Sequence, residues 1–122
     1  MSRSKDRGTA WETAIVRFLN TNGFPYAERR ALRGGNDRGD IAGLPSLVIE
    51  AKHVARTDLA GWVDEAELER DNDGARYGAV WFKRRGTTNP GRAYVLLTGD
   101  DFLRLYRDAQ GIDDAADGGQ ET

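Results

Sequence analysis

The chain of 122 residues has no cysteine, one histidine and three prolines. Without cysteine it forms neither a disulfide framework nor a thiolate zinc site, so we expect a cytoplasmic protein in a reducing compartment. No apolar run approaches the roughly 18 residues of a membrane span, and no apolar segment of a secretory signal follows the basic residues 1–7. The length predicts one domain, because domains average roughly 150 residues, and no association with membranes is expected.

The charge balance also argues, at first, against a nucleic-acid ligand, because the net charge is −2. The acidic residues are concentrated, however, in residues 64–73 and 108–122, which each carry a net charge of −5, so the rest of the chain stands at +8. Such separation permits a local basic face, although ordinary solvated charge is the alternative. We expect residues 64–73 to lie on a solvated helix face that points away from any site.

Three helices are predicted from apolar spacing at i, i+3, i+4 and i+7. The first begins at Thr9, where Thr9 and Glu12 match a capping box, and ends before Asn22 and Gly23. The second covers residues 58–71 and is capped by Thr57 or Asp58. The third is capped by Asp100, and its apolar positions are Phe102, Leu103, Leu105 and Tyr106.

Five strands are predicted between these helices, over residues 26–31, 40–43, 47–52, 79–83 and 93–97. The second and third form a hairpin around Pro45, whereas residues 33–39 and 84–92 are loops. This order predicts an α/β fold with a central mixed β-sheet flanked by helices. We expect a flexible N-terminus over residues 1–8, one domain over 9–107 and an acidic disordered tail over 108–122.

The hairpin brings together the residues with the clearest chemistry. If the turn is centred on Pro45, Asp40 lies opposite Glu50, and opposed side chains have their Cβ atoms roughly 5 Å apart. Lys52 lies on the same face, while Ile41 and Ile49 occupy the other. Two carboxylates this close repel unless a cation separates them or one is protonated. Their hard oxygens suit Mg²⁺ or Mn²⁺, and a neighbouring lysine can stabilise negative charge on a phosphate.

Each of these residues also has an ordinary interpretation that the sequence leaves open. Asp40 follows a glycine and fits a turn, and Glu50 and Lys52 fit a surface cross-strand pair. Glu12 is explained by the capping box alone, although it adds a third carboxylate if the first helix begins near the site. His53 is expected to have an ordinary structural role.

Basic side chains flank the acidic residues in the sequence and are candidates for DNA phosphate contacts. The candidates before and after the hairpin, and in the late loop, are Arg29, Arg30, Arg33, Arg38, Arg56, Lys83, Arg84 and Arg85.

The order of these motifs resembles that of the P-D-(D/E)-x-K nuclease superfamily, and in particular the small Holliday-junction resolvases of archaea and phages. The resemblance is carried by residues 8–12, 22–24, 29–30, 39–40 and 49–52, and it covers about residues 8–107. It implies a restriction-endonuclease-like core in which Glu12, Asp40, Glu50 and the Ala51 carbonyl bind metal. Lys52 is then catalytic. The chain departs from the motif in having Gly39, not proline, before the aspartate.

The sequence therefore predicts a Mg²⁺-dependent, structure-selective DNA endonuclease, best described as a Holliday-junction resolvase, with Mn²⁺ as a substitute. Cleavage that leaves a 5′-phosphate is implied by the resemblance. The expected partners are branched or double-stranded DNA and a second copy of the chain, with Trp62, Trp81 and Phe82 as dimer contacts. The alternatives are a general or nicking nuclease of the same fold, in repair or restriction, and a non-catalytic DNA-binding module.

Overall fold

The computed structural model describes residues 3–30 and 38–112. Arg33, most of the loop predicted over 33–39 and the tail beyond Ile112 lie outside these residues. The helices are α1 (Arg3–Thr21), α2 (Leu59–Asp73) and α3 (Gly99–Gln110), with a short 3₁₀ turn, η1, at Pro90–Arg92. The strands are β1 (Glu28–Arg29), β2 (Ile41–Ala42), β3 (Leu47–Lys52), β4 (Tyr77–Phe82) and β5 (Tyr94–Leu96).

The five strands form one mixed sheet in the order β1-β2-β3-β4-β5. Only the central pair, β3 and β4, is parallel, and α2 makes the crossover between them. The other neighbours are antiparallel. The predicted α/β class with a flanked mixed sheet is therefore confirmed, although β1 is shorter than the strand predicted over residues 26–31.

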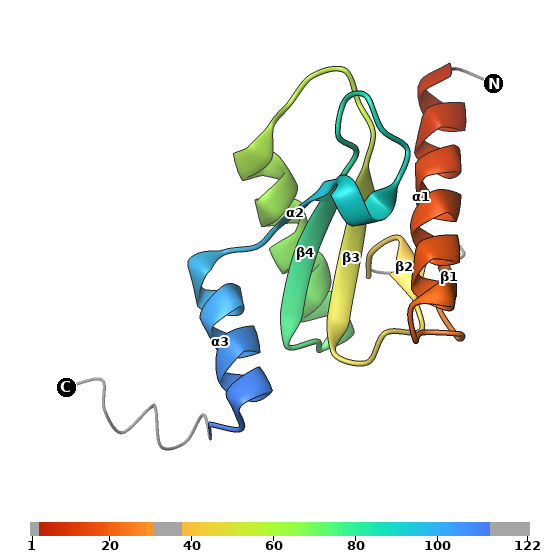
Figure 1. Cartoon of the computed structure of the whole chain (residues 1–122). Helices are drawn as coiled ribbons and strands as arrows, with labels where there is room; N and C mark the ends of the chain where they lie inside the picture. Colours follow the sequence, from red (N-terminus) through yellow and green to blue (C-terminus); the bar gives the residue numbers. More distant parts are fainter. Residues whose placement is uncertain (1–2, 31–37, 113–122) are drawn as a thin grey trace.

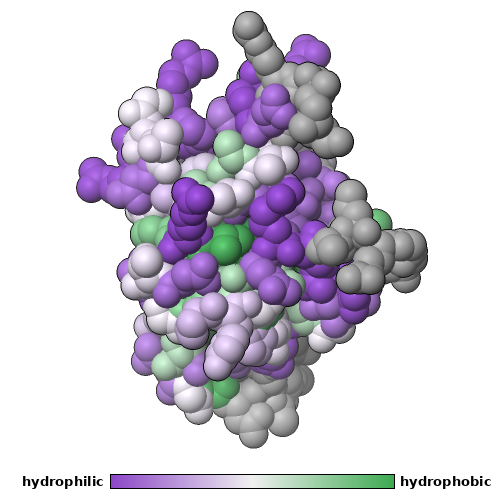
Figure 2. Space-filling view, turned by 90° about the vertical axis from the view of Figure 1, so that its right-hand side faces the viewer, coloured by the Kyte–Doolittle hydropathy of each residue, from purple (hydrophilic) through white to green (hydrophobic). Residues whose placement is uncertain are grey.

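Two helices cover the two faces of the sheet (Figure 1). On one face, Trp11 and Ile15 of α1 pack with Ile41 and Ile49. On the other, two residues of α2 pack on Val80 of β4. Because side chains alternate along β3, Ile49 points toward α1 and Glu50 points toward α2. The outer surface seen from the α1 side is mainly hydrophilic (Figure 2).

Helix α1 begins earlier than the capping box predicts, at Arg3 instead of after Thr9. Residues 3–8 are thus helical, and Thr9 and Glu12 lie within the helix and do not form its N-terminal cap. The extra turns have a tertiary contact, because the His53 side chain hydrogen-bonds to the Arg7 backbone. Helices of this length owe most of their stability to such packing, and local propensity alone does not locate their ends.

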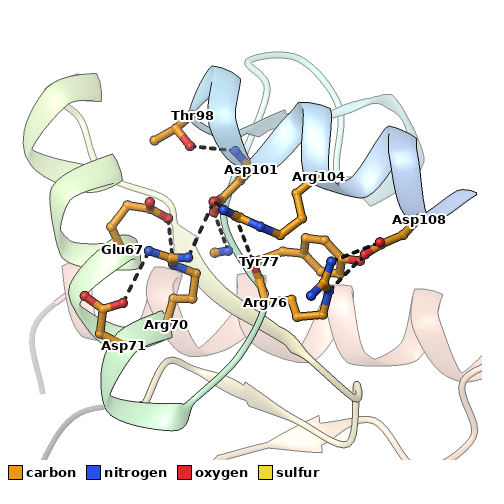
Figure 3. Close-up of polar contacts among 10 residues, drawn as sticks. Glu67, Arg70, Asp71, Arg76, Tyr77, Thr98, Asp101, Arg104 and Asp108 are labelled. Carbon is orange, nitrogen blue, oxygen red and sulfur yellow. Dashed lines mark hydrogen bonds and ion pairs between the residues drawn. The ribbon is translucent and has the colours of Figure 1, made fainter. Parts of the chain in front are cut away.

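Helix α3 packs with its polar side toward the protein, which the apolar spacing did not predict. Its cap is Thr98, not Asp100, because the Thr98 hydroxyl accepts the Asp101 N–H at 3.0 Å. The carboxylate of Asp101 is 1% exposed and accepts the Gly78 N–H of β4 at 2.9 Å (Figure 3). Arg104 donates to the Arg76 carbonyl at 3.3 Å. The helix also includes Asp108, which the sequence assigned to the tail.

The polar docking of α3 has a cause in the sheet. Strand β5 pairs only with Val80, Trp81 and Phe82, so the first half of β4 has no strand on its outer side. Buried backbone groups need hydrogen-bond partners, and Asp101 and Arg104 supply them. The four apolar residues of α3 consequently face outward, between 42% and 56% exposed: Phe102, Leu103, Leu105 and Tyr106.

Candidate functional site

The register of the β2–β3 hairpin is the predicted one, with Ile41 paired to Ile49. The Asp40 N–H donates to the Ile49 carbonyl at 2.9 Å, and the Asp40 carboxylate accepts the Ala51 N–H at 2.7 Å. Asp40 is thereby held at the level of Glu50 by the backbone of β3.

Gly39, the residue that departs from the nuclease motif, is required by this geometry. Its φ of +94° is in the left-handed region, which proline, fixed near −65°, does not reach. A Cβ at this position would also lie 2.8 Å from Val48 Cγ1 and 3.1 Å from the Ile49 carbonyl oxygen. Glycine before Asp40 is therefore the residue that lets the chain approach β3 closely enough to place the carboxylate.

Glu50 is the buried centre of the candidate site. Its residue exposure is 5%, and its Oε2 lies 3.2 Å from the Lys52 amino nitrogen. Its other oxygen, Oε1, is buried without a hydrogen-bond partner among the described residues. A carboxylate with an unsatisfied oxygen in a dry site is costly unless it is protonated or meets a cation.

Two further carboxylates reach Glu50 from α2, and the sequence did not predict them. One ligand oxygen each from Glu50, Glu65 and Glu69 lie within 4.8 Å of one another. Glu69 is only 1% exposed, so the expectation that residues 64–73 face away is wrong for these two residues. The sequence did contain a signal for Glu69. Residue 69 lies three positions after Ala66, so it falls on the same helix face as the apolar residues Trp62 and Ala66.

The acidic group changes the proton affinity of Glu50. Burial, followed by the negative charges of Asp40 and Glu69, raises the pKa of Glu50 from 4.5 to about 10. At neutral pH and without a cation, the Glu50 carboxyl therefore carries a proton. Three hard oxygen donors suit Mg²⁺ or Mn²⁺, and the raised proton affinity of Glu50 shows that its carboxylate favours a bound positive charge, so the residues fit the predicted metal.

Lys52 connects the acidic group to the surface. Its amino nitrogen lies 2.8 Å from Glu65 Oε1 as well as 3.2 Å from Glu50 Oε2. Burial lowers the pKa of Lys52, but the hydrogen bond to Glu65 and the charge of Glu50 outweigh this effect and raise it overall. Lys52 is therefore a fixed positive charge at the edge of the acidic group.

Glu12 lies outside this group. Its carboxylate pairs with the Arg29 Nε at 2.9 Å, and α1 packs on the sheet face opposite to Glu50. Arg38 lies 3.9 Å from Asp73, at the C-terminal end of α2. Arg56 is exposed in the loop before α2 and Arg30 is partly buried after β1, and neither residue lines the cleft described next.

A basic cleft of about 600 Å³ opens at the carboxyl ends of β3 and β4. In open α/β sheets this end of the parallel strands is the usual place for a ligand. Its basic lining residues come from α1, β3 and the loops after β3 and β4: Arg7, Lys52, His53, Lys83, Arg84 and Arg85. The predicted basic residues Lys83, Arg84 and Arg85 thus line the same cleft as Lys52. Arg7 lines it too, although the sequence analysis placed this residue in a flexible N-terminus.

His53 remains neutral in this cleft at physiological pH. Burial and the positive charges of Lys83 and Arg7 lower its pKa from 6.5, against the opposing effect of its hydrogen bond to the Arg7 backbone. Its hydrogen bond to the Arg7 backbone links the end of β3 to α1, and the structural role expected for His53 stays a prediction.

Comparison with family models, curated proteins and solved structures finds no match to this chain. In the part of the chain that the structure describes, no helix is long and apolar enough to cross a bilayer.

Proposed function

We propose that the protein is a divalent-metal-dependent endonuclease that hydrolyses phosphodiester bonds in DNA. The observation that carries this proposal is the position of Lys52, which pairs with two carboxylates of a buried acidic group and also lines a basic cleft. Lys52 is thus the residue that the basic cleft and the acidic group share.

The metal would be held by Glu50, Glu65 and Glu69, with the negative charge of Asp40 beside them. Mg²⁺ or Mn²⁺ at such a site lowers the pKa of a bound water and polarises a phosphate oxygen. Lys52 stabilises the negative charge that develops on the phosphate in the transition state. Lys83 and Arg85 hold the neighbouring phosphates and position the strand. Glu12 and the Ala51 carbonyl, implied as ligands by the resemblance, remain predictions.

A calorimetric titration with Mn²⁺ tests the metal site without DNA. The wild type should bind with a saturable heat and release protons, because Glu50 must lose its proton to bind the ion. Glu50→Gln should abolish binding, and Glu69→Gln should weaken it. Asp64→Asn removes an exposed carboxylate from the same helix and is the matched control, which should bind as the wild type does. Binding that survives Glu50→Gln would contradict the proposed site.

The narrower proposal is a Holliday-junction resolvase, which cuts two opposed strands of a four-way junction. A two-fold dimer supplies the two active sites that such cutting needs. The relevant test compares cleavage of four-way, three-way, linear double-stranded and single-stranded DNA by the same protein. Preference for the four-way junction supports the resolvase, whereas equal cutting of all duplexes leaves a general nuclease.

We propose that this dimer forms through the outer face of α3. Of the aromatic residues predicted as dimer contacts, Trp62 is 8% exposed, whereas Trp81 and Phe82 are partly buried, and the Trp81 indole donates to the Pro90 carbonyl. The outward apolar residues of α3 are instead available for contact. Residues 113–122 contain no large apolar side chain that would cover them.

Sedimentation of the full chain tests the dimer. The wild type should sediment as a dimer of two 13.5 kDa chains, and Leu103→Asp should sediment as the monomer. Tyr26→Asp, at a residue 84% exposed beside β1, is the control and should remain dimeric. A wild-type monomer at the concentrations used for cleavage would contradict the dimer.

A further inference from the structure

The basic cleft has an aromatic wall that the proposed phosphate contacts do not use. Trp62, Phe82 and Tyr94 all line the cleft. Their rings follow one another, with centroids 5.4 Å apart for the first pair and 5.3 Å for the second. Trp62 is buried in the core, whereas Tyr94 is 47% exposed. The row of three rings therefore runs from the core to Tyr94, whose half-exposed ring packs against Phe82.

An arginine lies over this exposed ring. The Arg84 guanidinium carbon is 5.5 Å from the Tyr94 ring centroid, and its Nη1 donates to the Arg92 carbonyl at 3.3 Å. Nucleic-acid bases stack on aromatic rings and on guanidinium planes. Stacking of a base on an aromatic ring is more favourable than an exposed cation–π contact. Replacing the Arg84–Tyr94 contact by a base stacked on Tyr94 therefore gives a net favourable free energy.

The remaining lining residues suit the phosphate and sugar of the same nucleotide. None of the described residues that line the cleft is acidic, and Arg7, Lys83 and Arg85 are basic. The volume of about 600 Å³ is in the range of about 300–1,000 Å³ that small-ligand sites occupy. Such a cleft is large enough to admit one nucleotide.

We propose that the cleft binds an unpaired nucleotide, with its base stacked between Tyr94 and Arg84 and its phosphates on the basic side chains. This inference rests on the proposed nuclease function for the bond that is cut, because Lys52 lines the same cleft. It adds the class of substrate, which is DNA with an unpaired nucleotide next to the scissile phosphate, as at a flap, a frayed branch point or a single strand.

Equilibrium binding of the full chain in EDTA, where a metal-dependent nuclease does not cut, tests this proposal. The probes are a labelled thymidine dodecamer, an abasic strand of equal length and a duplex of twelve base pairs. The wild type should bind the thymidine strand more tightly than the abasic strand. Tyr94→Leu should weaken binding of the thymidine strand about 5- to 150-fold but leave the abasic strand and the duplex unchanged. Tyr94→Phe retains the ring and should bind as the wild type does.

The outcomes separate this proposal from the nuclease function. Equal affinity of the wild type and Tyr94→Leu for the thymidine strand, in a variant whose unfolding temperature shows that it is folded, would overturn the stacking site. So would equal affinity of the wild type for the thymidine and abasic strands. If the ring-dependent binding is found but Mn²⁺ supports no cleavage of any DNA, the nucleotide site stands and the nuclease proposal fails.

Discussion

Replacing the buried Glu50 carboxyl should abolish a decline of folding stability with rising pH. With a pKa of 4.5 when unfolded and about 10 when folded, the folded state holds one more proton than the unfolded state between these values. The free energy of unfolding therefore falls as pH rises through this window, by at most about 1.4 kcal/mol per pH unit. Between pH 7.5 and 9.0 the loss is about 2 kcal/mol, which corresponds to about 8 °C in Tm for a domain of this size.

The chosen pH range isolates Glu50 from other shifted groups. Burial and the hydrogen bond to Asp101 raise the pKa of Glu67 only to about 7, and the lowered pKa of His53 lies below the range. Thermal unfolding in EDTA should show the decline for the wild type and a flat profile for Glu50→Gln. Saturating Mn²⁺ should abolish the wild-type decline, because the ion replaces the proton. Parallel profiles for the two proteins in EDTA would refute the assigned protonation of Glu50.

Three further outcomes follow from the site and from the docking of α3. Lys52→Ala should abolish cleavage, measured by single-turnover kinetics, because it removes the charge that stabilises the transition state. Its DNA affinity, measured in EDTA, should fall little, since one cation adds little to a polyelectrolyte contact; normal turnover would assign the role of Lys52 to another residue. Mg²⁺ and Mn²⁺ should support cleavage and Ca²⁺ should not, because Ca²⁺ coordinates with looser geometry, and equal rates in EDTA would exclude a metal mechanism. Asp101→Ala should cost about 1–3 kcal/mol in urea unfolding, because it leaves the buried Gly78 N–H without its acceptor, whereas a loss under 1 kcal/mol would show that the contact contributes little.

The sequence predicted the parts of the fold that depend on local pattern and pairing. The hairpin register followed from the turn at Pro45 and from the need to bury Ile41 and Ile49 on one face, since a shift by one residue would expose both. Local chemistry also limited the cap of α2 to Thr57 or Asp58, and it is the Asp58 side chain that accepts the Gly61 N–H, at 3.1 Å.

Features that depend on contacts between distant segments were not predicted. The position of Glu69 against Glu50 requires knowledge of how α2 crosses the sheet, because its acidic neighbours made the whole segment look solvated. The orientation of α3 depends on the shortness of β5, which leaves the Gly78 N–H to be satisfied by Asp101. In both cases an acidic residue occupies an interior position that composition assigns to the surface. For Asp101 the reason is the Gly78 N–H, which its carboxylate accepts.

Cleavage of an end-labelled four-way DNA junction by the purified full chain tests the central claim most directly. The wild type should cut in Mg²⁺, stop when EDTA is added and resume when Mg²⁺ is restored in excess, while Glu50→Gln remains inactive and Asp64→Asn cuts normally. Intact DNA throughout, with folded wild-type protein and saturating Mg²⁺ or Mn²⁺, would contradict the assignment of this site to phosphodiester hydrolysis.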